Sequence, residues 1–299
     1  MFWRYPKPSE HHASAFTWFA ATGALEQAEG IFELQGHFNL DDTKDGGVSD
    51  WMTQLSGKEV ERRATTKDSE NLPIGWQSAA SREATKVDPA NRYHAHCKCK
   101  GVGFWIARPS LRSTQASSPW PDVLVPYNSG PHHLPENETW WLRANKQRFL
   151  GGVCACNSCR LATGYEFVQW AFVPTVDITL DAEGRTPFST DFGSLKRYRS
   201  SADATRYFCK DCGATIFYEG HERPALFDVA VGLIEAPEGA RAESLLEWRT
   251  ERLSFREDAI LRAESLVKCL EAGMKAYNEH GAGRKGPAEE VRRVIDTER

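Results

Sequence analysis

The chain has 299 residues, of which 40% are hydrophobic, 26% charged and 11% aromatic. This is the composition of a globular protein, and it excludes a disordered or collagen-like chain. The 37 basic and 41 acidic side chains give a formal net charge of −4, which disfavours a surface for nucleic acid or for an anionic membrane. We recognise neither a secretory signal nor an apolar run of membrane-spanning length, so we expect a cytoplasmic protein.

The first 55 residues carry short apolar runs that end in an Asp-Gly-Gly turn at 45–47. With an offset of 209 residues, the stretch 21–30 aligns with 230–239, and five of the ten positions are identical. We therefore interpret residues 1–55 as the remnant of a preceding repeat copy, with chance similarity of two Gly-Glu strand ends as the alternative. Residues 56–91 are rich in charged and hydroxyl side chains and predict a polar linker.

The region 92–250 predicts a domain that is mainly β. Apolar side chains alternate along 102–106, which is typical of a strand. Aromatic and β-branched residues then form further short runs of the kind found in strands. These runs lie at 166–173, 192–198, 205–208, 214–218 and 226–233.

A long insertion, residues 110–148, interrupts this pattern of strands. Loops of such length are usually functional or packed by their own aromatic residues. We expect most of the tryptophans in this part of the chain to lie in the core, with an aromatic-lined cleft as the alternative. They are Trp120, Trp140, Trp141 and Trp170.

Near residue 241 the apolar residues begin to recur at intervals of three and four, as on one face of a helix. Leu246 and Trp248 stand near the start of this series. We predict a C-terminal helix within 251–280, followed by a charged tail at 281–299. Cys269 lies on the apolar helical face, where a small buried thiol is expected rather than a ligand.

Seven of the eight cysteines fall in three tight clusters. The clusters are Cys97 with Cys99, then Cys154, Cys156 and Cys159, then Cys209 with Cys212. In a reducing compartment such clusters indicate metal ligands or reactive thiols rather than disulfides. Zinc binds thiolates at about 2.3 Å in a tetrahedron, and one or two intervening residues allow a pair of sulfur atoms to share one ion.

Seven thiols divide naturally into a group of four and a group of three. Gly213 directly follows Cys212, so this last cluster predicts a tight turn whose N–H groups point at sulfur. Three protein ligands leave a fourth position open, which is how catalytic zinc sites differ from structural ones. The alternative is a second structural site whose fourth ligand is His96, His132, His133 or an acidic side chain.

Three motifs, in this order, resemble the glutathione-dependent formaldehyde-activating enzyme and centromere protein V family. They are C-x-C-x-x-V-x-F at 97–104, C-x-C-x-x-C-R-x-x-T-G at 154–164 and R-x-F-C-x-x-C-G at 206–213. The resemblance covers residues 93–250, and the N-terminal segment resembles the end of a preceding domain in fungal-type tandem members. The sequence departs from the family pattern in two ways. Lys100 stands where the family often has glycine, and Cys154 follows Cys99 by 55 positions, which is wider than in compact members.

The resemblance implies a mainly β, zinc-stapled β-tent domain, here with a C-terminal helix, that binds two Zn²⁺ ions. One structural ion would be held by Cys97, Cys99, Cys209 and Cys212. The second ion, with an open position, would be held by Cys154, Cys156 and Cys159, which would then be catalytic.

The resemblance also implies an activity. It is that of a carbon–sulfur lyase or synthase acting on S-hydroxymethylglutathione or a related adduct. The expected partners are therefore glutathione or another small thiol and a small aldehyde.

Other interpretations stay open. Arg160, beside the middle cluster, either holds a substrate carboxylate or offsets the charge of three thiolates. A non-catalytic zinc module that binds a protein is the alternative function. Apolar residues of the N-terminal remnant predict packing against the following domain or a homodimer, and His37 is expected to be structural.

Overall fold

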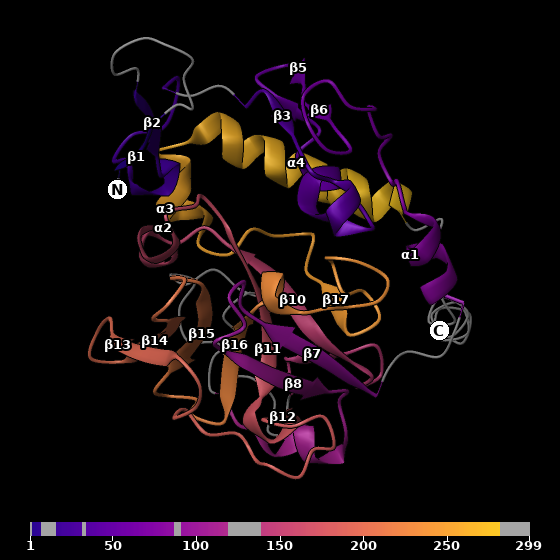
Figure 1. Ribbon diagram of the computed structural model, residues 1–299, viewed down its shortest axis with the longest axis vertical. Helices are drawn as coiled ribbons and strands as arrows, with labels where there is room; N and C mark the ends of the chain where they lie inside the picture. The colour runs from indigo at the N-terminus through magenta and orange to yellow at the C-terminus, as the bar shows by residue number, and fades with distance from the viewer. Residues whose placement is uncertain (1, 7–15, 32–33, 87–90, 119–138, 282–299) are drawn as a thin grey trace, which may run out of the picture.

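The computed structural model describes residues 2–6, 16–31, 34–86, 91–118 and 139–281. Within them the chain is mainly β, as predicted, with one large sheet, several small ones and few helices (Figure 1). The predicted tail at 281–299 lies almost entirely outside the described residues, as do Trp120, His132 and His133.

The large sheet has eight strands and carries most of the cysteine-bearing segments. In spatial order its main path is β13 (Leu195–Arg199), β14 (Ala204–Cys209), β15 (Thr215–Gly220), β16 (Leu226–Ala230), β11 (Val168–Pro174), β10 (Arg148–Cys154) and β17 (Leu246–Trp248). Strand β9 (Leu142–Arg143) pairs with β10 off this path. All pairs are antiparallel except β10 with β17.

A three-stranded sheet packs against the large one. It consists of β7 (Arg92–His96), β8 (Gly103–Ala107) and β12 (Ile178–Thr179), with β8 in the centre. Buried and half-buried residues alternate along β7 and β8, because successive side chains of a strand point to opposite faces. Phe104 of β8 meets Phe217 of β15 with ring centroids 4.8 Å apart, so the principal core lies between these two sheets.

The remaining elements are short. Two further sheets pair β3 (Gly36–His37) with β6 (Glu61–Arg62) and β4 (Gln54–Leu55) with β5 (Lys58–Glu59), and β1 (Phe2–Pro6) pairs with β2 (Phe16–Ala20). The helices are α1 (Ala79–Ala84), α2 (Asn157–Thr163), α3 (Arg256–Ile260) and α4 (Glu264–Gly281). Single 3-10 turns are η1 (Thr22–Ala24), η2 (Asp41–Thr43), η3 (Gly47–Trp51), η4 (Leu111–Gln115), η5 (Thr175–Asp177) and η6 (Val231–Leu233). No helix in the described part of the chain is both long and apolar enough to cross a lipid bilayer.

The strands predicted between residues 166 and 233 are all present, as β11 and β13 to β16. The helical periodicity, however, was wrong for Leu246 and Trp248. These residues form β17, which pairs in parallel with β10. A run of three residues has too few positions to distinguish the period of a strand from that of a helix. Here the pairing with β10 makes the run a strand.

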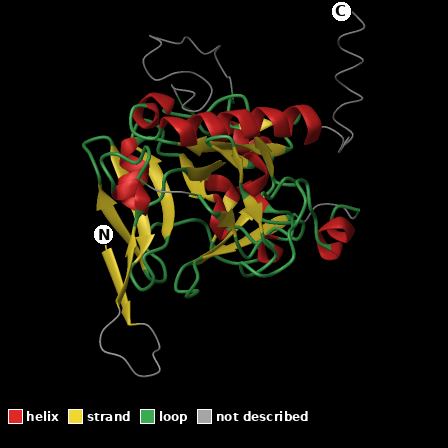
Figure 2. Ribbon diagram, turned by 90° about the horizontal axis from the view of Figure 1, so that it is seen from above, coloured by secondary structure: helices red, strands yellow, loops and turns green. Residues whose placement is uncertain are grey.

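Helix α4 forms a second core between the N-terminal segment and the large sheet (Figures 1 and 2). Its buried Val267, Leu270 and Met274 pack with the fully buried Trp51 of η3. At Gly273 the helix lies against the backbone of η3, since a Cβ there would be 1.9 Å from the carbonyl oxygen of Trp51. Glycine is therefore required for this close approach.

Buried charges also join the N-terminal segment to the domain. Arg241, only 1% exposed, donates to the carbonyl oxygen of Gly47 at 2.7 Å and to Asp50 Oδ2 at 3.1 Å. Asp50 Oδ1 in turn lies 2.6 Å from the guanidinium of Arg62. Removing one member would leave an unpaired buried charge, which is strongly destabilising.

Residues 56–91 hold more structure than the expected polar linker. They contain β5, β6 and α1, and Val60 and Leu72 are buried. Ser81 of α1 donates to the carbonyl oxygen of Glu238 at 2.5 Å. A few anchoring side chains are sufficient to hold a mostly hydrophilic segment to the surface of the domain.

The two aligned segments at an offset of 209 share one local structure. Each is a strand followed by a single 3-10 turn, η1 with Gly23 and η6 with Gly232. The residues before the turns, Ala21 and Ala230, have similar backbone angles, φ −73° and ψ 107° against φ −65° and ψ 118°. The common origin of the two segments and the division into a remnant, a linker and a domain stay predictions.

Burial of Asp177 generates a pH prediction. This carboxyl group in η5 is 3% exposed, and its burial, opposed by hydrogen bonding to Ser113, raises its pKa from 3.8 to about 6. The folded state therefore binds this proton more tightly than the unfolded chain. Its contribution to stability is favourable below pH 4 and is lost as pH rises through 6.

We expect Asp177→Asn to gain stability relative to the parent chain between pH 4 and pH 7, by about 2 kcal/mol. Urea unfolding at both pH values measures this difference. Asp191→Asn, at an exposed position, is the control and should show no such gain. An equal gain for both variants would contradict the assignment to Asp177.

Candidate metal centres

The first and third cysteine clusters meet at one edge of the fold. Cys97 and Cys99 lie in the turn after β7, whereas Cys209 ends β14 and Cys212 lies in the turn before β15. The four Sγ atoms lie within 4.8 Å of one another. Neighbouring sulfurs are 3.5 Å apart, both between Cys97 and Cys99 and between Cys99 and Cys209.

Backbone and hydroxyl groups stabilise negative charge on these four sulfurs. The N–H of Gly101 donates to Cys99 Sγ at 3.4 Å and that of Val102 to Cys97 Sγ at 3.3 Å. Burial acts to raise the pKa of the Cys209 thiol, but the Ser194 hydroxyl and backbone N–H groups outweigh it and lower this pKa to about 6. Such donors favour the thiolate form, which is the form that binds metal.

Both turns of this four-cysteine group use a left-handed residue directly after their second cysteine. Gly213 has φ 74° and Lys100 has φ 62°. This explains why glycine is common at the position of Lys100 in the resembling family, since a side chain costs free energy in this conformation. The amide N–H of Lys100 nevertheless closes its turn by donating to the carbonyl oxygen of Cys97 at 2.9 Å.

The middle cluster forms a second group, which we call the cysteine trio: Cys154, Cys156 and Cys159. Their Sγ atoms also lie within 4.8 Å of one another, with 3.7 Å between Cys154 and Cys159. Cys154 ends β10, and the other two belong to the first turn of α2. Cys154 and Cys159 are buried, whereas Cys156 is partly exposed.

The geometry of α2 brings the trio together. Cys156 is the N-cap residue, and its Sγ accepts from the N–H of Cys159 at 3.2 Å. This contact is the thiolate counterpart of a serine or aspartate N-cap. The helix ends at Gly164, whose φ of 74° allows the left-handed cap. The N-cap and the short helix together place Cys156 and Cys159 beside Cys154 at the end of β10.

Arg206 is the basic residue beside the trio. Its Nη2 lies 3.5 Å from Cys159 Sγ and 2.8 Å from Ser158 Oγ, and its guanidinium group lies over the ring of Tyr218. Hydrogen bonding to Cys154 and Cys156, together with the charge of Arg206, holds the pKa of the Cys159 thiol well below its usual value. Hydrogen bonding to Cys156 and Cys159, together with burial, raises the pKa of the Cys154 thiol, and the pKa of the Cys156 thiol is also raised. Without metal, Cys159 is therefore the sulfur of the trio best suited to carry negative charge.

Arg160 interacts electrostatically with Cys156, in keeping with one of its two expected roles, and its role in binding a substrate carboxylate stays a prediction. Its guanidinium donates to the carbonyl oxygen of Gly23 at 2.6 Å, and to those of Leu25 and the Asn157 side chain. It thereby fastens η1 to α2, and it does not line the cavity described below. Sequence reasoning missed Arg206 as a site residue, although it opens the third cysteine motif.

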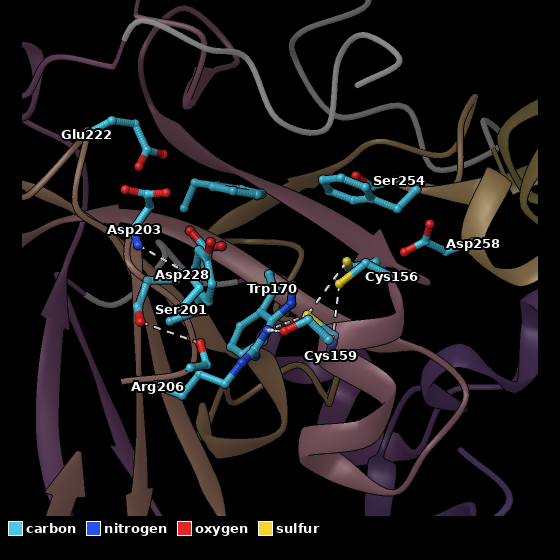
Figure 3. Close-up of a pocket in the computed structure, with 17 residues that line it drawn as sticks. Cys156, Cys159, Trp170, Ser201, Asp203, Arg206, Glu222, Asp228, Ser254 and Asp258 are labelled. Carbon is cyan, nitrogen blue, oxygen red and sulfur yellow. Dashed lines mark hydrogen bonds between the residues drawn. The ribbon is translucent and has the colours of Figure 1, made fainter. Parts of the chain in front are cut away.

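A cavity of about 580 Å³ opens onto the trio. Trp170, Phe172 and Tyr218 form much of its wall, and Arg206 lies along it. Figure 3 shows Cys156 and Cys159 on one side and Asp203 and Glu222 on the other. The volume is in the range of small-molecule sites in proteins. Trp170, expected mostly as a core residue, is 2% exposed and also lines this cavity.

Four carboxyl groups line the cavity, those of Asp203, Glu222, Asp228 and Asp258. Asp228 is neutralised by Arg223, with contacts of 2.8 and 3.2 Å to its two oxygens. Asp258 Oδ2 accepts from the backbone N–H of Asn157 at 2.9 Å, which places it near Cys156 (Figure 3). Arg206 is the only basic residue among the described residues of the lining.

The other candidates of the sequence lie elsewhere. His96 is grouped with His94 and Glu235 rather than with the trio. Cys269 is partly buried and hydrogen-bonds to the carbonyl oxygen of Gln54. His37 Nε2 lies 2.9 Å from the carbonyl oxygen of Met52, in keeping with a structural role.

The donor sets fit metal ions. Four thiol sulfurs within 4.8 Å of one another are the ligand set and the spacing of a closed tetrahedral site, and three beside a cavity are those of an open one. Both groups can therefore hold a metal.

Part of the chain is similar to a known protein family. Residues 142–250 match the family model described as glutathione-dependent formaldehyde-activating enzyme. This segment is similar to that family. It contains the trio, Arg206, Cys209 and Cys212 but begins after Cys97 and Cys99.

The similarity to solved structures is weak. A crystal structure of a Rhodobacter sphaeroides protein shares 16% sequence identity with this chain, and the match covers 52% of this chain and 98% of that protein with a TM-score of 0.27. Among curated proteins no match is found.

The left-handed conformation of Lys100 predicts that Lys100→Gly stabilises the metal-loaded protein by about 0.5–1 kcal/mol. The relief of backbone strain exceeds the entropic cost of glycine. Chemical denaturation measures the free energy of unfolding. In the control Lys98→Gly, where φ is not positive, only the entropic cost remains and stability should fall. A loss of stability in Lys100→Gly would contradict the strain argument.

Proposed function

We propose that this chain is a zinc-dependent carbon–sulfur lyase or synthase that makes and breaks a thiol–aldehyde adduct, S-hydroxymethylglutathione or a related compound. The observation that carries the proposal is the 580 Å³ cavity that opens onto three gathered cysteines. The family match at 142–250 supports the same substrate class. A purely structural metal group needs no adjoining cavity of this size.

In this proposal Cys97, Cys99, Cys209 and Cys212 hold one Zn²⁺ and the trio holds a second. When bound to the trio, Zn²⁺ supplies an open coordination position that lowers the pKa of a small thiol. Arg206 offsets the negative charge of the three cysteine thiolates and so keeps this position receptive to an anionic sulfur. It acts as a positioning residue because its contacts are to Ser158 and Cys159.

The charges of the cavity orient the substrate. Asp203 and Glu222 lie opposite Cys156 and Cys159 (Figure 3). They attract a cationic group, and in glutathione this is the ammonium group of the γ-glutamyl residue. The carboxylates of the substrate point away from these acids. The aromatic wall of Trp170 and Phe172 excludes water from the reacting carbon.

Asp258 is the proposed proton carrier. In the synthetic direction the thiol sulfur forms a bond to the aldehyde carbon, and the C=O π pair moves onto oxygen. Asp258 takes the thiol proton and delivers it to that oxygen, which yields the hydroxymethyl group. The reverse sequence releases the aldehyde and the thiol, so atoms and charge balance in both directions. Its fixed position beside Cys156 supports this role.

The alternative, a non-catalytic zinc module for a protein partner, receives less support. Such a module would use an exposed surface, whereas the trio faces an interior cavity lined by aromatic and ionisable side chains.

The first test replaces one ligand. The zinc-loaded protein should accelerate exchange between free formaldehyde and S-hydroxymethylglutathione, measured by NMR exchange spectroscopy. Cys156→Ser should lose this acceleration and about one equivalent of zinc, because a trio reduced to two sulfurs holds the ion weakly. Cys269→Ser, outside both groups, is the matched control and should retain both. Absence of acceleration by the parent chain would refute the activity.

The second test separates chemistry from binding. Asp258→Asn should lower kcat by about 100-fold or more, while KM for glutathione and the zinc content remain as in the parent. Glu257→Gln, its exposed neighbour on α3, should leave all three quantities unchanged. If Asp258→Asn retains the parental kcat, Asp258 is not the proton carrier.

A further inference from the structure

Outside the cysteine groups, two histidines and a glutamate converge on the edge of the three-stranded sheet. His94 and His96 lie on β7, and Glu235 follows η6. One potential ligand atom from each lies within 4.8 Å of the others. We propose that these residues form a third metal site, specific for a divalent transition cation such as Zn²⁺ and separate from both cysteine groups.

The positions of the two histidines follow from strand geometry. Residues two apart on a strand point to the same face, so His94 and His96 lie side by side, with ring centroids 5.0 Å apart. Glu235 faces both of them. Its Oε2 is 3.1 Å from His94 Nδ1, and its Oε1 is 2.8 Å from His96 Nε2.

The backbone fixes the glutamate in this place. The N–H of Glu235 donates to the carbonyl oxygen of His94 at 2.8 Å, and Ile234 forms an antiparallel bridge with Ala95. His94 is held on its other side by the ring of Trp105, which stacks at 4.7 Å. All three ligands are thus supported by a sheet rather than by a loose surface, as a binding site requires.

The hydrogen bonding of His96 points to a cation. His96 Nδ1 lies 2.9 Å from the carbonyl oxygen of Cys97, and because a carbonyl oxygen can only accept, Nδ1 carries a proton. In the neutral ring Nε2 then presents a lone pair to a carboxylate oxygen at 2.8 Å. Two acceptors at this distance repel each other, so either a metal ion or a proton lies between them.

A metal ion satisfies this arrangement. Histidine ligands of metals usually donate their second ring N–H to a carbonyl or carboxylate oxygen, which is the contact that His96 makes. Two imidazoles and one carboxylate suit Zn²⁺ and other late transition ions better than Mg²⁺ or Ca²⁺, which prefer oxygen ligands. The side chain of Glu235 is 57% exposed and that of His96 is 16% exposed, so an ion can enter from solvent.

The alternative occupant is a proton shared by His96 and Glu235, with no metal. The two cases differ in one measurement. If a proton occupies the cluster, substitution of the two histidines leaves zinc binding unchanged. If a metal ion occupies it, the same substitutions abolish the binding of that ion. Neither depends on whether the trio is catalytic.

The experiment uses the full chain with both cysteine groups loaded with zinc. Further Zn²⁺ is titrated at neutral pH, the bound ions are counted by native mass spectrometry, and the affinity is measured by calorimetry. We expect one additional ion in the parent chain. In His94→Gln/His96→Gln the affinity for this ion should fall by about 100-fold or more, and in Glu235→Gln by at least about 10-fold.

The matched control is His221→Gln, which removes a described histidine that belongs to none of the three ligand groups and should retain the additional ion. Paramagnetic Ni²⁺ provides the location, because it should broaden the indole N–H resonance of Trp105, which stacks on His94. The proposal is overturned if the parent chain binds no additional Zn²⁺, or if the control loses the ion and the cluster variant retains it.

Discussion

Seven cysteine sulfur atoms are gathered into two groups, and the structure around them has to stabilise the negative charge of their thiolates. Thiolates held within a few ångström of one another repel, and burial adds a desolvation cost. The four-cysteine group meets this cost with backbone N–H groups and a serine hydroxyl. The trio meets it with an N-cap amide and one arginine. In both groups a bound cation would complete the balance, and both donor sets fit one.

The difference between the two groups follows from their surroundings. The four-cysteine group joins a turn after β7 to a turn between β14 and β15 and thereby links two sheets. The trio lies within one stretch of chain, at the end of β10 and the start of α2, and therefore links little. It faces the cavity that Trp170 and Tyr218 line. The four-cysteine group joins distant segments and so contributes to the stability of the fold. The trio joins none, which is consistent with the catalytic role proposed for it.

The fold class and the three cysteine clusters could be predicted from the sequence because both rest on short-range patterns. Alternation of apolar residues identified the strand around Phe104, and aromatic and β-branched residues identified the strand around Phe217. Spacing identified the clusters, but only the family resemblance indicated that the first and third clusters meet, since Cys99 and Cys209 are 110 positions apart. Period alone failed at Leu246, where the partner β10 determines the structure. The polar composition of residues 56–91 likewise concealed anchors such as Arg62, whose partner Asp50 lies 12 residues earlier.

The side chains around the candidate site were harder to predict. Arg160 and Arg206 each stand near cysteines in the sequence, and nothing in the local pattern distinguishes them. The distinction arises because η1 offers Arg160 two carbonyl oxygens, whereas β14 turns Arg206 toward Cys159. The pairing of His94 and His96 with Glu235 requires contacts between residues 139 or more positions apart. Such contacts follow from the order of the strands and not from spacing along the chain.

One strand connects the two cysteine groups. β14 carries Arg206, which contacts the trio, and ends in Cys209, which belongs to the four-cysteine group. Arg206 and Cys209 are three positions apart on β14, so their side chains point to opposite faces of the sheet. Cys209 fixes the end of β14 against the turn of Cys97, and the position of Arg206 follows from that of the strand. The four-cysteine group thereby bears on the electrostatic balance of the trio, because the strand that supplies the counter-charge is the one whose end Cys209 holds in place.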